Sequence, residues 1–152
     1  MGLDMYLSNK RYLSKHFDPV DSERIEKIND AFGIEGDEDG DYGAQEVTFR
    51  VAYWRKANAI HKWFVDNVQE GEDECREHYV SREQLEALRD ACIEAVADPD
   101  NAGDWLCPTE GFFFGSTEID EWYFDALKET IKQLNACLKM DKAWSFYYCS
   151  SW

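Results

Sequence analysis

Hydrophobic and polar residues alternate at both ends of the chain. Residues 2–7 place two leucines and a methionine on one face, and residues 144–152 alternate in the same way. A period of two residues is typical of a strand that buries one face. A third apolar run, the phenylalanines at 112–114, lies between two glycines and is typical of a short strand. The pattern therefore predicts strands at both termini and at 112–114.

Apolar residues spaced three and four positions apart predict helices in four places. The first helix covers residues 21–32, and the second carries its apolar stripe over residues 54–68, after a strand-like stretch at 47–51. The third starts at Ser81, which with Gln84 matches the two partners of a capping box. A fourth helix is expected up to residue 139, with Ser116 or Thr117 as its cap. Residues 98–104 are predicted to form a loop.

These elements predict an α+β fold in a single domain, residues 1–152, with an acidic loop at 35–46. The sheet is expected to be small and mostly antiparallel, formed by both termini and the 112–114 strand. Three main helices, which start near Thr48, Ser81 and Thr117, are expected to pack against this sheet. A chain of 152 residues can bury one core of its own.

The lengths of the apolar runs predict a cytoplasmic protein that has no membrane partner. No apolar stretch approaches the roughly 18 residues that a membrane span needs, and residues 1–13 lack the regions of a secretory signal. The five cysteines form an odd set without a CxxC pair. Such a set favours free thiols in a reducing compartment.

The chain is strongly acidic, with 32 Asp and Glu against 16 Lys and Arg and a net charge of −16. Ten of these acids and only two bases lie within residues 21–46. A negative field repels the backbone of nucleic acids, so we expect no direct nucleic-acid partner. The same field attracts a protein with a basic surface, although solubility alone also explains it.

The acidic loop at 35–46 contains a partial match to a calcium-binding loop. Glu35, Asp37, Asp39 and Glu46 fall at positions 1, 3, 5 and 12 of that motif, and Gly40 falls at position 6. Calcium is therefore the one cofactor that the sequence suggests. A solvated acidic loop explains the same residues without any metal.

One face of the predicted second helix carries several polar groups that could line a ligand pocket. Trp54, Asn58 and His61 share this face because they are spaced three and four residues apart, and Arg55 lies beside them. The alternative for His61 is a buried side chain that is hydrogen-bonded to a neighbouring carbonyl or acid.

A second set of candidates follows the phenylalanine run: Ser116, Thr117, Glu118 and Trp122. A helix start after a glycine can bind phosphate through its free amides. Acids already occupy this helix start, and no Lys or Arg lies between residues 89 and 128. We therefore expect a ligand with amine, hydroxyl or cationic groups, or a basic protein loop. Ordinary helix capping by these acids is the alternative explanation.

The sequence contains no GxSxG, HExxH or P-loop motif, so it names no reaction. A hydrolase that uses Glu118 or Asp120 together with His61 remains as an alternative.

Five stretches resemble an uncharacterised family of small, mostly hypothetical proteins that tailed phages and their bacterial hosts encode: GLDMYL, AYWRKANAIHKWFV, HYVSREQL, PTEGFFFGSTEIDEWYF and FYYCSSW. The resemblance implies a phage-type accessory protein in the cytoplasm of a bacterial cell. We expect it to act without catalysis by binding a host protein, in an anti-defence or host-takeover role. The alternative is a binder that sequesters a small, nucleotide-like signal between aromatic faces.

Overall fold

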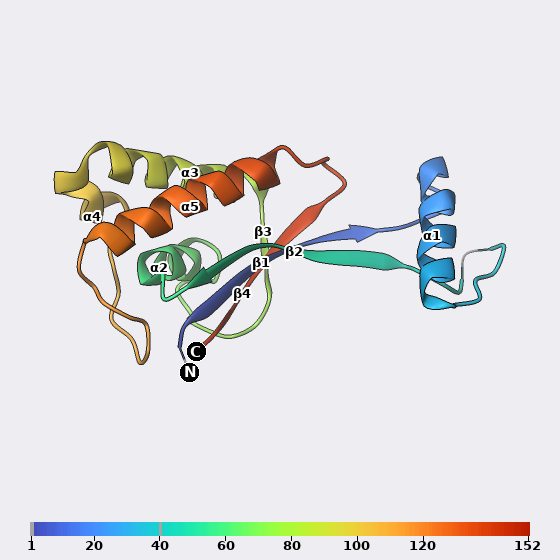
Figure 1. The fold of residues 1–152 in the computed structure, drawn as a ribbon, viewed down its shortest axis with the longest axis horizontal. Helices are drawn as coiled ribbons and strands as arrows, with labels where there is room; N and C mark the ends of the chain where they lie inside the picture. Colours follow the sequence, from blue (N-terminus) through green and yellow to red (C-terminus); the bar gives the residue numbers. More distant parts are fainter. Residues whose placement is uncertain (1, 40) are drawn as a thin grey trace. The chain divides into compact units, whose positions relative to one another are not determined.

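The computed structural model describes residues 2–39 and 41–152 and has the predicted α+β class (Figure 1). Four strands form one antiparallel sheet in the order β2-β1-β4-β3. They are β1 (Asp4–Tyr12), β2 (Glu46–Arg55), β3 (His78–Val80) and β4 (Ser145–Ser151). The predicted terminal strands, β1 and β4, are confirmed and lie next to each other in the centre of the sheet.

The helices are α1 (Pro19–Phe32), α2 (Asn58–Asn67), α3 (Arg82–Ala97), α4 (Ala102–Trp105) and α5 (Glu121–Leu138), with a short 3-10 helix at Pro99–Asn101. The stretch 98–104 is thus largely helical, although its glycine, proline and aspartates favoured a loop. No helix in the described part of the chain is long and apolar enough to cross a membrane.

The chain divides into two compact units. Residues Lys10–Phe49 form the smaller unit, and Arg50–Trp152 together with the residues up to Asn9 form the larger one. The core of the larger unit follows from the hydrophobic periodicity: β1 and β4 bury alternate residues, and α3 and α5 pack side by side through their apolar stripes (Figure 1). Fully buried side chains of this core include Leu3, Met5, Leu7, Leu85, Leu88, Leu127, Leu134, Phe146 and Tyr148.

The start of α3 has the predicted capping box. The Gln84 N–H donates to Ser81 Oγ at 3.1 Å, and the Ser81 N–H donates to Gln84 Oε1 at 2.8 Å. These two bonds satisfy backbone donors that the first helical turn cannot satisfy itself.

The prediction of a strand at 112–114 is wrong, because these residues form a turn. The Phe114 N–H donates to the carbonyl of Gly111 at 3.2 Å, and Phe113 has a left-handed φ of 67°. A Cβ on Gly111 would lie 2.3 Å from the Phe114 ring, so this turn requires glycine there. The strands that flank β1 and β4 are instead β2 and β3. β3 pairs with β4 through His78↔Tyr148 and Val80↔Phe146.

The second predicted helix begins later than expected. Residues 46–55 stay extended as β2, and α2 starts at Asn58 instead of near Thr48. Ala52 and Trp54 are buried on either side of the exposed Tyr53, so the period of the strand and not of the helix places them in the core. Lys56 ends the strand with a left-handed φ of 56°.

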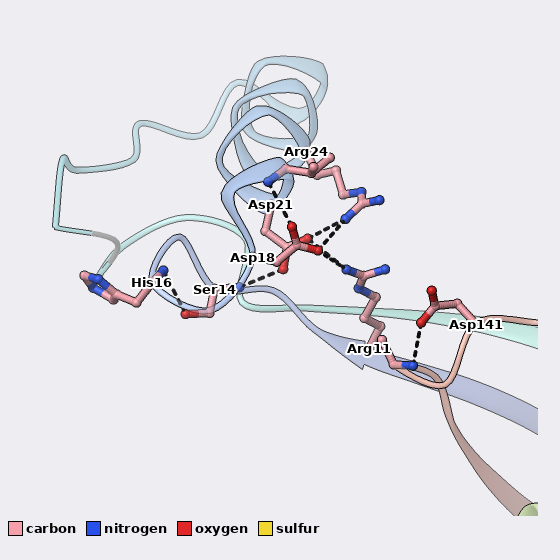
Figure 2. Close-up of polar contacts among 9 residues, drawn as sticks. Arg11, Ser14, His16, Asp18, Asp21, Arg24 and Asp141 are labelled. Atoms are coloured by element: carbon pink, nitrogen blue, oxygen red, sulfur yellow. Dashed lines mark hydrogen bonds and ion pairs between the residues drawn. The ribbon is translucent and has the colours of Figure 1, made fainter.

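In the smaller unit, an ion-pair network fixes the start of α1 (Figure 2). Asp18 is the N-cap, and its carboxylate accepts from the Val20 N–H. Asp21, only 2% exposed, accepts from Arg24 at 2.8 Å, from Arg11 at 3.2 Å and from the Ser14 N–H at 3.1 Å. The helix starts two residues before the predicted boundary and ends at Gly33, as predicted.

The acidic loop of the smaller unit folds around the buried side chain of Asn29. Its Oδ1 accepts from the Ala44 N–H at 2.9 Å. A Cβ on Gly36 or Gly43 would lie 2.6 or 2.4 Å from its Nδ2 atom. Gly36 and Gly43 therefore have a packing role around Asn29.

Candidate functional site

The larger unit contains a pocket of about 370 Å³ at the end of β2. The starts of α2 and α5 and the segment 115–118 form its other walls. Ligand sites in proteins usually have volumes of about 300–1,000 Å³, so this pocket falls in that range. Its lining includes Arg55, Lys56, Asn58, Gly115, Ser116, Glu118, Asp120, Trp122 and Ala126.

Asn58 holds one wall of the pocket in place. Its Nδ2 donates to the carbonyls of Phe114 at 3.2 Å and Ser116 at 2.8 Å, and its Oδ1 accepts from the Thr109 N–H at 3.2 Å. The Asn58 side chain is 4% exposed, so it positions the segment 109–116 from inside. Since these bonds occupy both ends of its amide, Asn58 acts here as a structural residue.

Gly115 and Lys56 bring two backbone segments into close contact at this wall. Gly115 has a φ of 92°, and a Cβ placed on it would lie 3.2 Å from Lys56 Cβ. Lys56 itself has the left-handed φ noted above, which is uncommon for a residue other than glycine. The pocket is therefore built on a constrained backbone, which is a frequent feature of functional sites.

The pocket presents side chains of both charges. Arg55 and Lys56 both line it, and neither forms an ion pair with a described residue. Glu118 is likewise without an ion pair in the described part of the chain, whereas Asp120 caps α5 by accepting from the Tyr123 N–H at 3.0 Å. The first turn of α2 also has no side-chain cap, because Ala57 occupies the N-cap position.

An exposed aromatic ring completes the pocket. Trp122 lines it although the side chain is 81% exposed, so one face of the indole is open to a ligand. The neighbouring Tyr123 is buried and donates its hydroxyl to the carbonyl of Leu106 at 2.7 Å. Burial raises the pKa of Tyr123 to about 12, so this hydroxyl stays neutral.

Five of the eight ligand-binding candidates from the sequence line this pocket: Arg55, Asn58, Ser116, Glu118 and Trp122. Thr117 lines a more open depression beside it, together with Ser116 and Glu118. Trp54 lies in the core, where its Nε1 donates to Thr130 Oγ1 at 2.8 Å. The fold thus brings the five lining candidates together in one pocket, whereas Trp54 is not part of its lining.

His61 also lies away from the pocket lining, as a buried residue on α2. Its Nδ1 is 2.8 Å from the Tyr148 hydroxyl, and its Nε2 is 3.0 Å from Asp73 Oδ2. The second oxygen of Asp73 accepts from Trp152 Nε1 at 3.0 Å. This environment matches the alternative interpretation of His61 as a hydrogen-bonded core residue.

The four acidic residues of the calcium-like loop are not gathered around one point. Glu35 and Asp37 line one hollow of the smaller unit, Asp39 lines another, and Glu46 begins β2. Gly40 of the motif lies outside the described residues. Over residues 2–39 and 41–152, no group of three His, Cys, Asp or Glu side chains is placed to hold a metal ion. Calcium binding stays a prediction.

Lys56 is a charged residue of the pocket that was not among the candidates from the sequence. Nothing in its local sequence indicated the left-handed turn that brings Lys56 to the segment 115–118. Comparisons of the chain with protein-family models, curated proteins and solved structures gave no match.

Proposed function

We propose that this protein binds a small polar molecule in the pocket between β2, α2 and α5. The observation that carries the proposal is the pocket itself, about 370 Å³ in volume and lined by Arg55, Lys56, Glu118 and the exposed Trp122. Ligand sites combine apolar surface with a few convergent polar groups, and this lining has that composition. The aromatic ring offers stacking, and the charged groups offer orientation.

The proposal concerns binding without a chemical step. The Ser116 hydroxyl oxygen accepts from the Glu118 N–H at 3.0 Å, and Asp120 is engaged as a helix cap. Both contacts shape the rim of the pocket. In such a site, the fold holds the walls while Trp122 and the charged side chains contact the ligand.

The direct experiment is native mass spectrometry of the purified protein, followed by thermal-shift screening with amines, amino acids, nucleosides and nucleotides. The variant Ala126→Trp places a large ring in the pocket, whereas Ala97→Trp adds the same ring at an exposed position on α3. We expect a bound small molecule, or a stabilising compound, with the wild type and Ala97→Trp, and loss of it with Ala126→Trp. No ligand by either method, or equal binding to Ala126→Trp, would overturn the proposal.

A second candidate function is the binding of a basic host protein by the smaller unit, in the phage-type role that the sequence suggests. The observation in its favour is that this unit exposes large apolar side chains, with Phe17 at 88% and Phe32 at 79%. The same unit carries the cluster of acids within residues 21–46. Exposed apolar groups among charges of one sign are typical of interaction surfaces.

Affinity capture from a bacterial lysate would test this second function. The double variant Phe17→Ser, Phe32→Ser changes the smaller unit, and Phe112→Ser is the matched control in the larger unit. We expect one basic partner that is lost with the double variant, retained by the control and weakened by salt. Capture that is the same for all three proteins would count against a role for this unit.

A further inference from the structure

We propose that the ligand of the pocket is a planar ring that carries an anionic group at one end and a hydrogen-bond donor at the other. The anionic group would contact Arg55 and Lys56, the donor would contact Glu118, and the ring would stack on Trp122. This inference rests on the proposed function, because it specifies the chemistry of the same pocket.

Two basic residues, Arg55 and Lys56, line the pocket. The protein has a net charge of −16, and most of its arginines have a partner. Arg11, Arg24, Arg76 and Arg89 pair with carboxylates, Arg82 donates to backbone carbonyls, and Arg50 stacks over the ring of Tyr6. Arg55 has no such partner in the described chain, although acids are abundant. An unpaired arginine and the adjacent lysine in one cavity provide charge and donors for an anion.

The fold also restricts where these cations lie. The left-handed backbone of Lys56 turns the chain from β2 into α2, and its side chain packs against Gly115. The amides in the first turn of α2 add positive partial charge to the same wall, since Ala57 provides no side-chain cap. The positive side of the pocket is thus built into the strand-to-helix turn.

The pocket lining also contains two acids, of which Asp120 caps α5 and Glu118 is free to contact a ligand. Glu118 shares the cavity with Arg55 and Lys56 but forms no ion pair with them or with any other described residue. An anion alone would be repelled by Glu118, and a cation alone would be repelled by the two bases. A ligand with an anionic group at one end and a donor at the other satisfies both sides. Trp122 lies in the first turn of α5, and its exposed ring offers a face for stacking.

Two matched pairs of probes test this chemistry by isothermal titration calorimetry. AMP and adenosine differ by a phosphate, and tryptophan and tryptamine differ by a carboxylate. We expect AMP or tryptophan to bind at least about tenfold more tightly than its partner without the anion, as a charge-assisted contact provides. The pair with the larger difference identifies phosphate or carboxylate as the anionic group.

Variants assign the contacts. Arg55→Gln with Lys56→Asn removes both charges, and asparagine tolerates the left-handed backbone at 56. We expect this double variant to bind the two members of a pair equally, and Glu118→Gln to weaken binding of both members. The control Lys128→Gln removes an exposed charge of α5 outside the pocket and should change neither affinity.

The inference is overturned if adenosine and tryptamine bind as tightly as their anionic partners, or if the double variant retains the preference. Binding of the anion-free probes that Ala126→Trp abolishes would leave the proposed function standing while this inference fails. If none of the four probes binds at millimolar concentration, the inference is also overturned. The proposed function is decided separately, by the native mass spectrum and the thermal-shift screen.

Discussion

The imidazole of His61 and the hydroxyl of Tyr148 meet in the core, with 2.8 Å between Nδ1 and Oη. Asp73 lies 3.0 Å from Nε2 and favours the proton on that nitrogen, so Nδ1 accepts the hydrogen bond from Tyr148. Asp73 also accepts from the indole of Trp152. His61 on α2 therefore links Asp73, in the segment after α2, to Tyr148 on β4.

Removal of the Tyr148 hydroxyl tests this network. In Tyr148→Phe the ring and its stacking on Phe64 remain, but Nδ1 of His61 loses its donor in a buried place. We expect a loss of about 1–3 kcal/mol in the free energy of unfolding, measured by urea denaturation. The control Tyr79→Phe changes an exposed tyrosine of β3 and should cost under about 0.5 kcal/mol. Equal, small losses would show that the bond contributes nothing to stability.

The parts of the fold that the sequence predicted correctly depend on neighbours along the chain. Ser81 and Gln84 are three residues apart, so their capping box is visible in the sequence. The terminal strands are equally local, since a period of two residues determines which side chains face the core. The turn at 112–114 is different, because it depends on the Phe114 ring folding back over Gly111. β3 has only three residues, too few to show an alternating pattern.

The pocket combines residues from two distant parts of the chain, and for this reason the sequence presents them as two separate sets of candidates. Ser116, Glu118 and Trp122 were singled out because they surround the predicted start of the last helix, which begins at Glu121 with Asp120 as its cap and not near Thr117. No base lies near them along the sequence, but Arg55 and Lys56 line the same cavity in the folded chain. Asn58 also lines the pocket, but its amide is hydrogen-bonded to the pocket wall.

The loss of the Asn58 amide should loosen that wall. Asn58→Ala removes two bonds to carbonyls of the segment 109–116 and leaves the Thr109 N–H without its acceptor. We expect a cost of about 1–3 kcal/mol in stability. Hydrogen exchange of the Thr109 amide should become faster. The control Asn67→Ala removes an exposed bond at the end of α2 and should leave that amide unchanged. Unchanged exchange in Asn58→Ala would contradict a positioning role.

Acid should destabilise the start of α1. Burial disfavours the charged form of Asp21, but hydrogen bonds from Arg24 and Ser14 and the charges of Arg11 and Arg24 outweigh it and lower the pKa below the ordinary 3.8. A lowered pKa in the folded state gives stability that is complete above about pH 4 and is lost as the pH falls through the folded value. Urea denaturation between pH 6 and pH 2 measures this loss, and amide chemical shifts of residues 11–24 follow the protonation of Asp21 over the same range.

The matched variant for the acid transition is Asp21→Asn, which cannot ionise. Its stability should be lower at pH 6 than that of the wild type, because Arg11 loses a partner in a largely buried place. Its amide shifts around Ser14 should then show less change with pH. An acid transition of the same size in both proteins would assign the pH dependence to groups other than Asp21.

Gly115 and Gly71 have similar φ angles, so their alanine variants distinguish the cost of backbone strain from the cost of a steric contact. Gly115 has a φ of 92° and Gly71 a φ of 85°, but a Cβ on Gly71 would meet no atom within 4 Å, whereas a Cβ on Gly115 would lie 3.2 Å from Lys56 Cβ. Both alanine variants should lose about 1–2 kcal/mol from backbone strain. Gly115→Ala should lose more, and it should also weaken any ligand of the pocket by displacing Lys56, while Gly71→Ala should bind normally. Equal stability and equal binding in the two variants would mean that the close approach of the segment 115–118 to Lys56 does not shape the pocket.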